Sequence, residues 1–180
     1  MENDSKERIL IRPLNDMEIE TALSLAWKVF CEYEAPDYAP EGTEEFRKCL
    51  KDDNYLNGII YYGAFDGDRL VGMLGIRKEK RHICFCFVEG QYHRMGIGTK
   101  LLRRMMKDFT GQTITLNSSP YGLPFYKAIG FSATEKEQTI NGIRFTPMEY
   151  KVPEHGAIIF VTGIFRTHCF KNSRFSFTIP

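Results

Sequence analysis

The sequence lacks several features that would assign it to a broad class. It has no apolar run of the roughly 18 residues that a membrane-spanning helix needs. Its N-terminus, MENDSKERIL, is polar and acidic, unlike a signal peptide. Its formal net charge is only +1, which gives no electrostatic reason to expect nucleic acid as a partner. We therefore expect neither a membrane nor a nucleic acid among its partners.

The cysteines lack the spacing of a disulfide framework or a metal-binding pair. There are 5 of them, an odd number, and no CxxC motif joins any two. This usage is typical of reduced thiols, so we expect a cytoplasmic protein.

The chain is long enough for one well-packed domain and short for two, since it has 180 residues. We expect a domain over 1–152 and an extension over 153–180. The extension carries one acidic residue, Glu154, and the apolar patch AIIFVTGIF. An added strand, a dimer contact and a disordered appendage are all open for it, so we assign it no function and keep a homodimer as one possibility.

Hydrophobic periodicity and turn signals predict an α/β (α+β) fold. We expect about seven strands in a mixed, mostly antiparallel sheet, flanked by about four helices. Only the crossover from 82–88 to 113–117 is expected to be parallel. The predicted strands are 8–14, 58–65, 70–77, 82–88, 113–117 and a hairpin of 133–140 with 143–152 around Asn141-Gly142. The predicted helices are 17–34, one capped by Thr43, one from Ile97 ending before Gly111, and one within 120–129.

Two glycines mark the start of the helix at Ile97, in the stretch QYHRMGIGTKLL (91–102). A turn between a strand and a helix leaves several backbone N–H groups pointing one way, which favours an anion. Gly96 and Gly98 would let a diphosphate approach that backbone, with Arg94 and Lys100 adding positive charge. The residue order does not fit a P-loop, and Leu101 takes the place of the third glycine of a dinucleotide fingerprint.

The stretch His93-Arg94-Met95-Gly96-Ile97-Gly98 resembles the [Q/R]-x-x-G-x-[G/A] motif of the Gcn5-related N-acetyltransferase superfamily, although His93 departs from the motif's first position. The segment NSSPYGLPFYKAIGF (117–131) resembles the second cofactor motif of the same superfamily. The predicted order of elements from about residue 8 to 152 is also similar. Together these features identify the chain as a member of that superfamily.

The resemblance implies acetyl-CoA, or another acyl-CoA, as the donor for direct transfer to an amine, with no metal. It implies that 82–88 and 113–117 splay apart to hold the pantetheine arm, with Phe87 and Val88 lining it and Asn117 against it. The Val88 amide would face the thioester carbonyl. Tyr126 would be the acid that protonates the leaving thiolate. The implied pyrophosphate site comprises His93, Arg94, Met95, Gly96, Ile97, Gly98 and Thr99.

A general base is harder to assign. His82 begins its strand where several protein acetyltransferases of the superfamily carry a catalytic glutamate, and its ordinary pKa near 6.5 suits the role. Glu89 is a second candidate, and deprotonation through water is a third possibility. We expect His82, Cys84 and Cys86 to alternate onto one face of the strand, which suggests a metal site, but His82 and Cys86 would then lie about 13 Å apart, too far to share one metal ion. We therefore expect both cysteines to pack in the core.

The acceptor is expected near CEYEAPDYAPEGTEE (31–45), since this segment helps to wall the acceptor pocket in the superfamily. Its carboxylates among aromatic rings would favour a cationic amine. The alternative is a solvated acidic loop. The candidate substrate residues are Glu32, Tyr33, Glu34 and Tyr38.

The sequence thus predicts an N-acetyltransferase that acts through a ternary complex. We expect its acceptor to be the primary amine of a small cationic molecule. Two alternatives stay open. One is acetylation of a protein or peptide, and the other is a non-catalytic acyl-CoA-binding regulatory module on the same fold.

Overall fold

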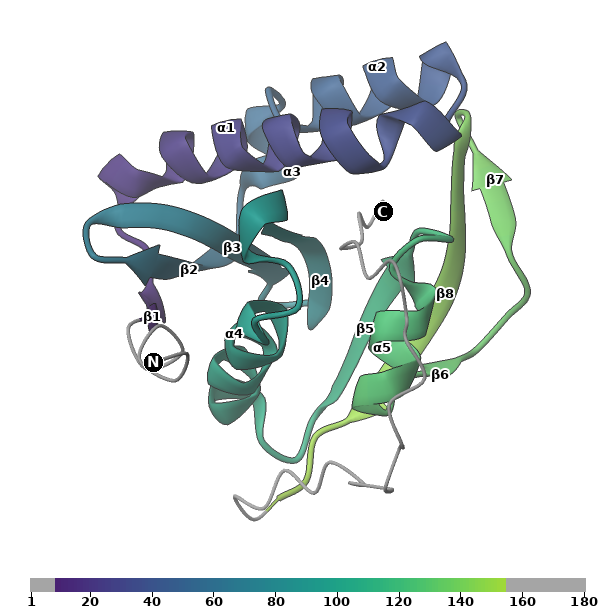
Figure 1. Ribbon diagram of the computed structural model, residues 1–180. Coiled ribbons are helices and arrows are strands. Elements are labelled where there is room, and N and C mark those ends of the chain that lie inside the picture. The colour runs from purple at the N-terminus through teal and green to yellow at the C-terminus, as the bar shows by residue number, and fades with distance from the viewer. Residues whose placement is uncertain (1–8, 155–180) are drawn as a thin grey trace.

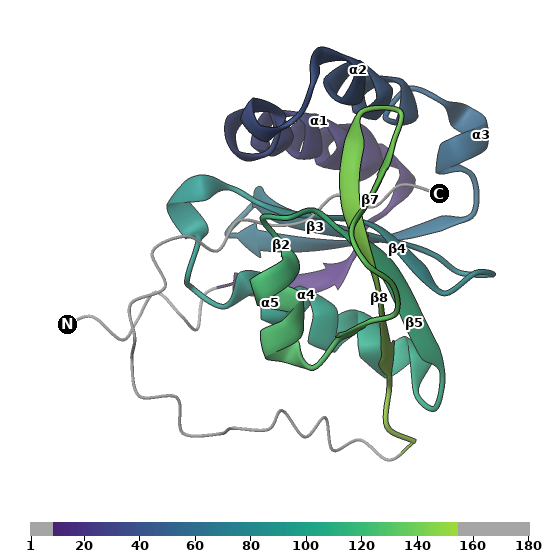
Figure 2. The ribbon, with the colours of Figure 1, turned by 90° about the vertical axis from the view of Figure 1, so that its right-hand side faces the viewer.

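The computed structural model describes residues 9–154, so the predicted extension beyond 154 lies outside the described residues. The elements form a single mixed sheet with helices on both faces (Figures 1 and 2). Their order is β1 (Ile9–Pro13), α1 (Asp16–Tyr33), α2 (Pro40–Cys49), α3 (Asp53–Leu56), β2 (Ile59–Asp66), β3 (Arg69–Arg77), β4 (His82–Val88), α4 (Ile97–Met106), β5 (Thr113–Ser118), α5 (Leu123–Ile129), β6 (Ser132–Ala133), β7 (Gln138–Ile140) and β8 (Ile143–Lys151). Short 3₁₀ turns lie at Ala35–Asp37, Gly90–Tyr92 and Lys107–Phe109.

The strands run in the order β1-β2-β3-β4-β5-β8-β6, and β7 pairs with β8 beside this path. Every pair is antiparallel except β4 with β5. The predicted α/β class and the parallel crossover are therefore confirmed, although the described sheet has 8 strands rather than about seven. No helix within residues 9–154 has the length and apolarity to cross a membrane.

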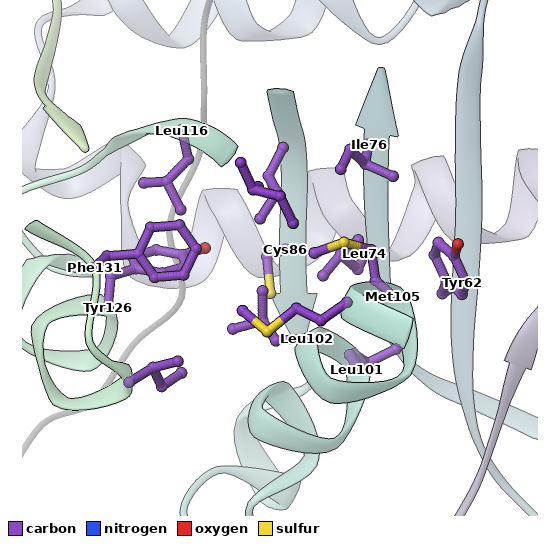
Figure 3. Packing of buried hydrophobic residues seen from close by; sticks show 14 of the residues in the cluster. Tyr62, Leu74, Ile76, Cys86, Leu101, Leu102, Met105, Leu116, Tyr126 and Phe131 are labelled. Carbon is purple, nitrogen blue, oxygen red and sulfur yellow. The ribbon is translucent and has the colours of Figure 1, made fainter. Parts of the chain in front are cut away.

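Each face of the sheet has its own hydrophobic core. Helices α1 and α2 cover one face, while α4 and α5 cover the other (Figure 2). Phe30 and Phe46 pack on the α1 face with ring centroids 4.0 Å apart. Leu101, Met105 and Tyr126 belong to the core of the α4 face, part of which is drawn in Figure 3. The sheet thus separates two packed layers.

The first two helices begin at signals that are readable in the sequence. Asn15 caps α1 through a capping box in which the Glu18 side chain accepts from the Asn15 N–H. Pro40 occupies the first turn of α2, after Ala39 at the cap position. The prediction that Thr43 caps this helix was therefore wrong, because the fixed φ of Pro40 starts the helix four residues earlier.

Strand β4 contains a β-bulge. Gly75 pairs with Phe85 whereas Ile76 pairs with Ile83, so Cys84 is an extra residue on β4. Cys84 and Phe85 consequently both belong to the core of the α1 face, while Cys86 belongs to that of the α4 face. The prediction that Cys84 and Cys86 share a face was wrong, because one inserted residue reverses the alternation beyond it. Both thiols are buried, as predicted.

Candidate functional site

Strands β4 and β5 diverge soon after they begin. They pair only at His82 with Thr115 and Ile83 with Leu116, close to the start of each strand. Their carboxyl ends then separate, as Figure 1 shows. The backbone of β4 beyond Ile83 therefore has no strand beside it on the β5 side within the described residues. A chain of amide and carbonyl groups, such as a pantetheine arm, fits such an edge.

A hydrogen bond between β3 and the end of β4 shows which backbone groups of β4 face the gap. The Glu89 N–H donates to Val71 O on β3 at 2.9 Å. Because backbone groups alternate sides along a strand, the N–H and C=O of Val88 point toward β5, as do those of Cys86. Those of Phe87 point toward β3, and its ring lies in the core of the α1 face. Cys86 and Val88 thus present backbone groups to the gap, and Cys86 is a residue that the sequence analysis did not select.

The loop before α4 exposes its backbone at Gly96. Gly96 has φ +75° and caps α4, and Arg94 also has a positive φ of 65°. A Cβ at Gly96 would meet no atom of the described residues within 4 Å. The first backbone bond of the helix runs from Lys100 N–H to Gly96 O, so the amides of Ile97–Thr99 precede it and point out of the helix end. This arrangement fits a pyrophosphate.

His93 joins the loop to the end of β4. Its Nε2 lies 2.8 Å from Val88 O. Its ring packs against Tyr33, from the last turn of α1, with centroids 4.8 Å apart. Tyr33 also lies directly on Gly90, where an added Cβ would be 1.7 Å from its hydroxyl oxygen. The structure therefore brings His93, Val88 and Tyr33 together, although the sequence analysis placed them in different roles.

Tyr126 is fully buried on α5, facing β4. In Figure 3 its hydroxyl points toward the strand, where Cys86 lies. Burial raises the pKa of Cys86 to about 12, although a hydrogen bond from Tyr126 partly offsets this increase. The Tyr126 hydroxyl is therefore directed at the part of β4 that faces the gap.

Glu34, on the α1 side of the sheet, influences the same thiol electrostatically. It follows α1 and is only 2% exposed. Its charge acts on Cys86, contributing to the raised pKa of that thiol. It also acts on Tyr38, whose pKa is raised first by burial and then by Glu34. Glu32, two residues earlier, is exposed, so the structure separates two carboxylates that the sequence analysis grouped together.

Helix α2 and the β7–β8 hairpin lie against each other near Tyr38, one of the predicted acceptor residues. The Tyr38 hydroxyl donates to Arg144 O at 3.3 Å. At the hairpin turn, Gly142 lies against the backbone of α2, since a Cβ at Gly42 would be 2.5 Å from Gly142 O. Asn141 Nδ2 donates to Glu45 Oε1 at 3.3 Å. These contacts tie the two elements together over the end of α1.

His82 lies at the end of β4 where this strand still pairs with β5. Its Nδ1 is 2.8 Å from Thr115 Oγ1. Burial, with Arg77 and Lys80 nearby, lowers the pKa of His82 to about 4. Four residues of strand, about 13 Å if fully extended, separate it from Cys86. His82 is thus not brought together with Tyr126 and Glu34 around Cys86.

Glu89, the second candidate base, is held in ion pairs. Arg69 contacts its carboxylate at 2.6 Å and Lys28 at 3.1 Å. Burial alone would raise the pKa of Glu89, but hydrogen bonds from Lys28, Arg69 and Gln91 outweigh it and lower the pKa. A carboxylate stabilised in this way is a weak base, and its geometry is that of a structural anchor.

The end of β5 carries polar residues. Asn117 pairs with Pro147 of β8 and is partly buried. Ser118 and Ser119 are fully buried, and the Ser119 hydroxyl accepts from Gly122 N–H at 3.1 Å, which shapes the turn into α5. These serines belong to the segment that resembles the second cofactor motif, but no role was predicted for them. Within residues 9–154, no group of three or more His, Cys, Asp or Glu side chains is placed to hold a metal ion.

Comparisons with known proteins agree on one family. A family model described as an acetyltransferase (GNAT) domain matches residues 34–152. A Gcn5-related N-acetyltransferase from Rhodopseudomonas palustris superposes with a TM-score of 0.68 at 20% identity, covering 79% of this chain and 95% of its own. No curated protein matches the sequence significantly.

Two further solved structures share the fold. PaiA N-acetyltransferase from Thermoplasma acidophilum, in complex with coenzyme A, has a TM-score of 0.61 at 22% identity and covers 79% of this chain and 98% of its own. The ribosomal-protein-S18-alanine N-acetyltransferase from Escherichia coli has a TM-score of 0.57 at 13% identity and covers 83% and 97%. At these identities the likeness concerns the fold alone.

Proposed function

This chain belongs to the GNAT acetyltransferase family, and we propose that it transfers the acetyl group of acetyl-CoA to the primary amine of a small cationic molecule. One observation carries the proposal. The buried Tyr126 hydroxyl points at Cys86, in the part of β4 whose backbone faces the gap, and the charge of the buried Glu34 raises the pKa of the same thiol from the other layer. This would put a carboxylate for the amine and a phenol for the thiolate on the two sides of the strand where a thioester would lie.

Acetyl-CoA, when bound, supplies an activated thioester. The amides of Ile97, Gly98 and Thr99 and the guanidinium of Arg94 would hold its pyrophosphate. The Val88 N–H, which points into the gap, would stabilise negative charge developing on the carbonyl oxygen. Asn117 would contact the pantetheine arm from β5.

Tyr126 would donate its proton to the departing CoA sulfur. Its hydroxyl is already directed at a thiol, that of Cys86, so a second sulfur in the gap would meet the same donor. Cys86 itself is a poor nucleophile, because its pKa of about 12 keeps the thiol protonated near pH 7. This supports direct transfer to the amine rather than an acetylated enzyme.

Glu34 would receive the amine. A carboxylate that is only 2% exposed attracts an ammonium group strongly and can accept its proton. Tyr38 and Tyr33 would line this side with their rings. His82 is the alternative base, but it begins β4, four residues before Cys86, so we assign proton transfer to Glu34 or to water held by it.

The acceptor would be small. A peptide would need an open groove between α2 and the β7–β8 hairpin, and these elements are in backbone contact at Gly42 and Gly142. Acetylation of a protein or peptide is therefore the second candidate rather than the first.

The test is an assay of product formation. The purified full chain is incubated with acetyl-CoA and a panel of diamines, polyamines, amino-acid amides and a peptide with a free N-terminus, and acetylated products are detected by mass spectrometry. We expect acetylated di- or polyamines. Products only from the peptide would favour the second candidate, while acetyl-CoA binding without any product would favour a non-catalytic binding module.

A further inference from the structure

We propose that His93 is a positioning residue that keeps the end of β4 aligned toward the reacting thioester. It would replace the strand neighbour that Val88 lacks on its β5 side. The inference rests on the proposed function for its catalytic consequence, but its structural part concerns this chain alone.

The bond has a defined direction. Val88 O is a carbonyl oxygen and can only accept, so His93 Nε2, at 2.8 Å, carries the proton and donates. On the other side of the same peptide unit, the Glu89 N–H donates to Val71 O at 2.9 Å. The peptide between Val88 and Glu89 is therefore held from both sides, by His93 and by β3.

A peptide held in this way also orients its neighbour. The N–H and C=O of Val88 point to the same side of the strand. Fixing the carbonyl with His93 therefore restrains the direction of the Val88 N–H, the group proposed to face the thioester carbonyl. Paired strands achieve this through ladder bonds, but β4 and β5 pair only as far as Ile83 and Leu116.

The His93 ring is itself held in place. Tyr33 packs on it with centroids 4.8 Å apart, and Gly90 leaves room for Tyr33 because it has no Cβ. Since Tyr33 directly precedes Glu34, the acceptor side and the end of β4 are joined through one histidine. This contact accounts for a histidine at the position where the family motif has glutamine or arginine.

Two variants separate a donor from simple packing. His93→Leu keeps much of the volume and removes the donor, whereas His93→Gln retains an N–H of similar reach. Gln91→Leu is the control, because it removes a donor from the same loop that bonds Glu89 rather than Val88. Each protein is examined without ligand by amide hydrogen exchange, then for acetyl-CoA affinity by calorimetry, and then for kcat with the best amine of the panel.

We expect His93→Leu to speed exchange at the Val88 and Glu89 amides and to lower kcat by about 10- to 100-fold, with the acetyl-CoA dissociation constant changed less than about threefold. His93→Gln should recover most of both effects, and Gln91→Leu should show neither. Unchanged exchange in His93→Leu would overturn the proposal, as would a loss of acetyl-CoA affinity in place of kcat, or no rescue by glutamine. If the wild-type protein transfers no acetyl group, the proposed function fails while the exchange experiment still decides the role of His93.

Discussion

Glu34 and Tyr126 influence the pKa of the same thiol, that of Cys86, from opposite layers of the protein. The charge of Glu34 raises this pKa, and a hydrogen bond from Tyr126 lowers it. Tyr126 is fully buried on α5, and Glu34 follows α1 and is only 2% exposed. The bulge at Cys84 turns Cys86 toward the core of the α4 face, which also holds Tyr126, while the neighbours of Cys86 pack under α1. The bulge in β4 therefore determines which side chains of the strand lie beside Tyr126.

Gly96 and Gly58 form a matched pair for testing the anion loop. Both have positive φ, +75° and +74°, and a Cβ at either would meet no described atom within 4 Å. Replacing either by alanine should cost roughly 1–2 kcal/mol of stability through backbone strain. Only Gly96→Ala should also weaken acetyl-CoA binding, by about tenfold or more, because its Cβ and altered backbone oppose the pyrophosphate. Thermal unfolding and calorimetry measure the two effects. Equal acetyl-CoA affinity in both variants would contradict the assignment of the loop.

Glu34→Gln should lower kcat/KM for a cationic amine by about 10²-fold, because the change removes both the charge that attracts the ammonium and the acceptor for its proton. Acetyl-CoA affinity should stay unchanged. Glu20→Gln, at an exposed position on α1, is the control and should behave as the wild type. An undiminished kcat/KM in Glu34→Gln would remove Glu34 from the mechanism and return His82 to consideration.

His82 should make stability depend on pH in a defined window. Its folded pKa of about 4 lies below the ordinary value of 6.5, so between these values the unfolded chain binds a proton that the folded chain does not. Stability should therefore fall by on the order of 2–3 kcal/mol as the pH drops from about 7 to 4, with no further loss from this group below 4. His82→Asn, whose amide can still bond Thr115, should flatten the dependence of Tm on pH. If Tm depended on pH in the same way in the wild type and in His82→Asn, the burial of the His82 ring would be contradicted.

Gly42→Ala tests the contact between α2 and the hairpin. Alanine within a helix ordinarily stabilises by about 1 kcal/mol relative to glycine. Here the new Cβ would lie 2.5 Å from Gly142 O, so the hairpin must move. We expect a net loss of about 1–3 kcal/mol, read from thermal unfolding, and a higher ratio of peptide to small-amine acetylation. A stabilised variant with unchanged selectivity would show that this contact does not limit the acceptor.

Much of the fold could be predicted from local signals. Strand β4 has the predicted bounds, 82–88, because apolar residues fill it and the glycine loop ends it. The Asn141-Gly142 hairpin was also predicted, and both residues have the positive φ that a tight two-residue turn needs. The short helix α3 (Asp53–Leu56) was missed, since one turn of helix carries no periodicity.

The arrangement of the site was harder to predict because it depends on the bulge. Every residue of β4 after His82 is apolar, so the sequence does not show that the strand contains an extra residue. Neither the orientation of Cys86 nor its position near Tyr126 could therefore be predicted. Similarly, Glu32 and Glu34 are both glutamates in the same short segment, and the sequence does not distinguish them. Only the end of α1 at Tyr33 decides that Glu34 turns inward while Glu32 stays exposed.

The most direct test of the whole account compares wild-type protein with Tyr126→Phe, with Tyr150→Phe on β8 as a matched control. CoA thiol release from acetyl-CoA with a saturating amine gives the rate, and calorimetry gives the affinity for acetyl-CoA. We predict a loss of about 10²-fold or more in kcat for Tyr126→Phe with affinity retained, and wild-type behaviour for Tyr150→Phe, because only Tyr126 places its proton at the leaving sulfur. An undiminished rate in Tyr126→Phe would contradict the catalytic site proposed here.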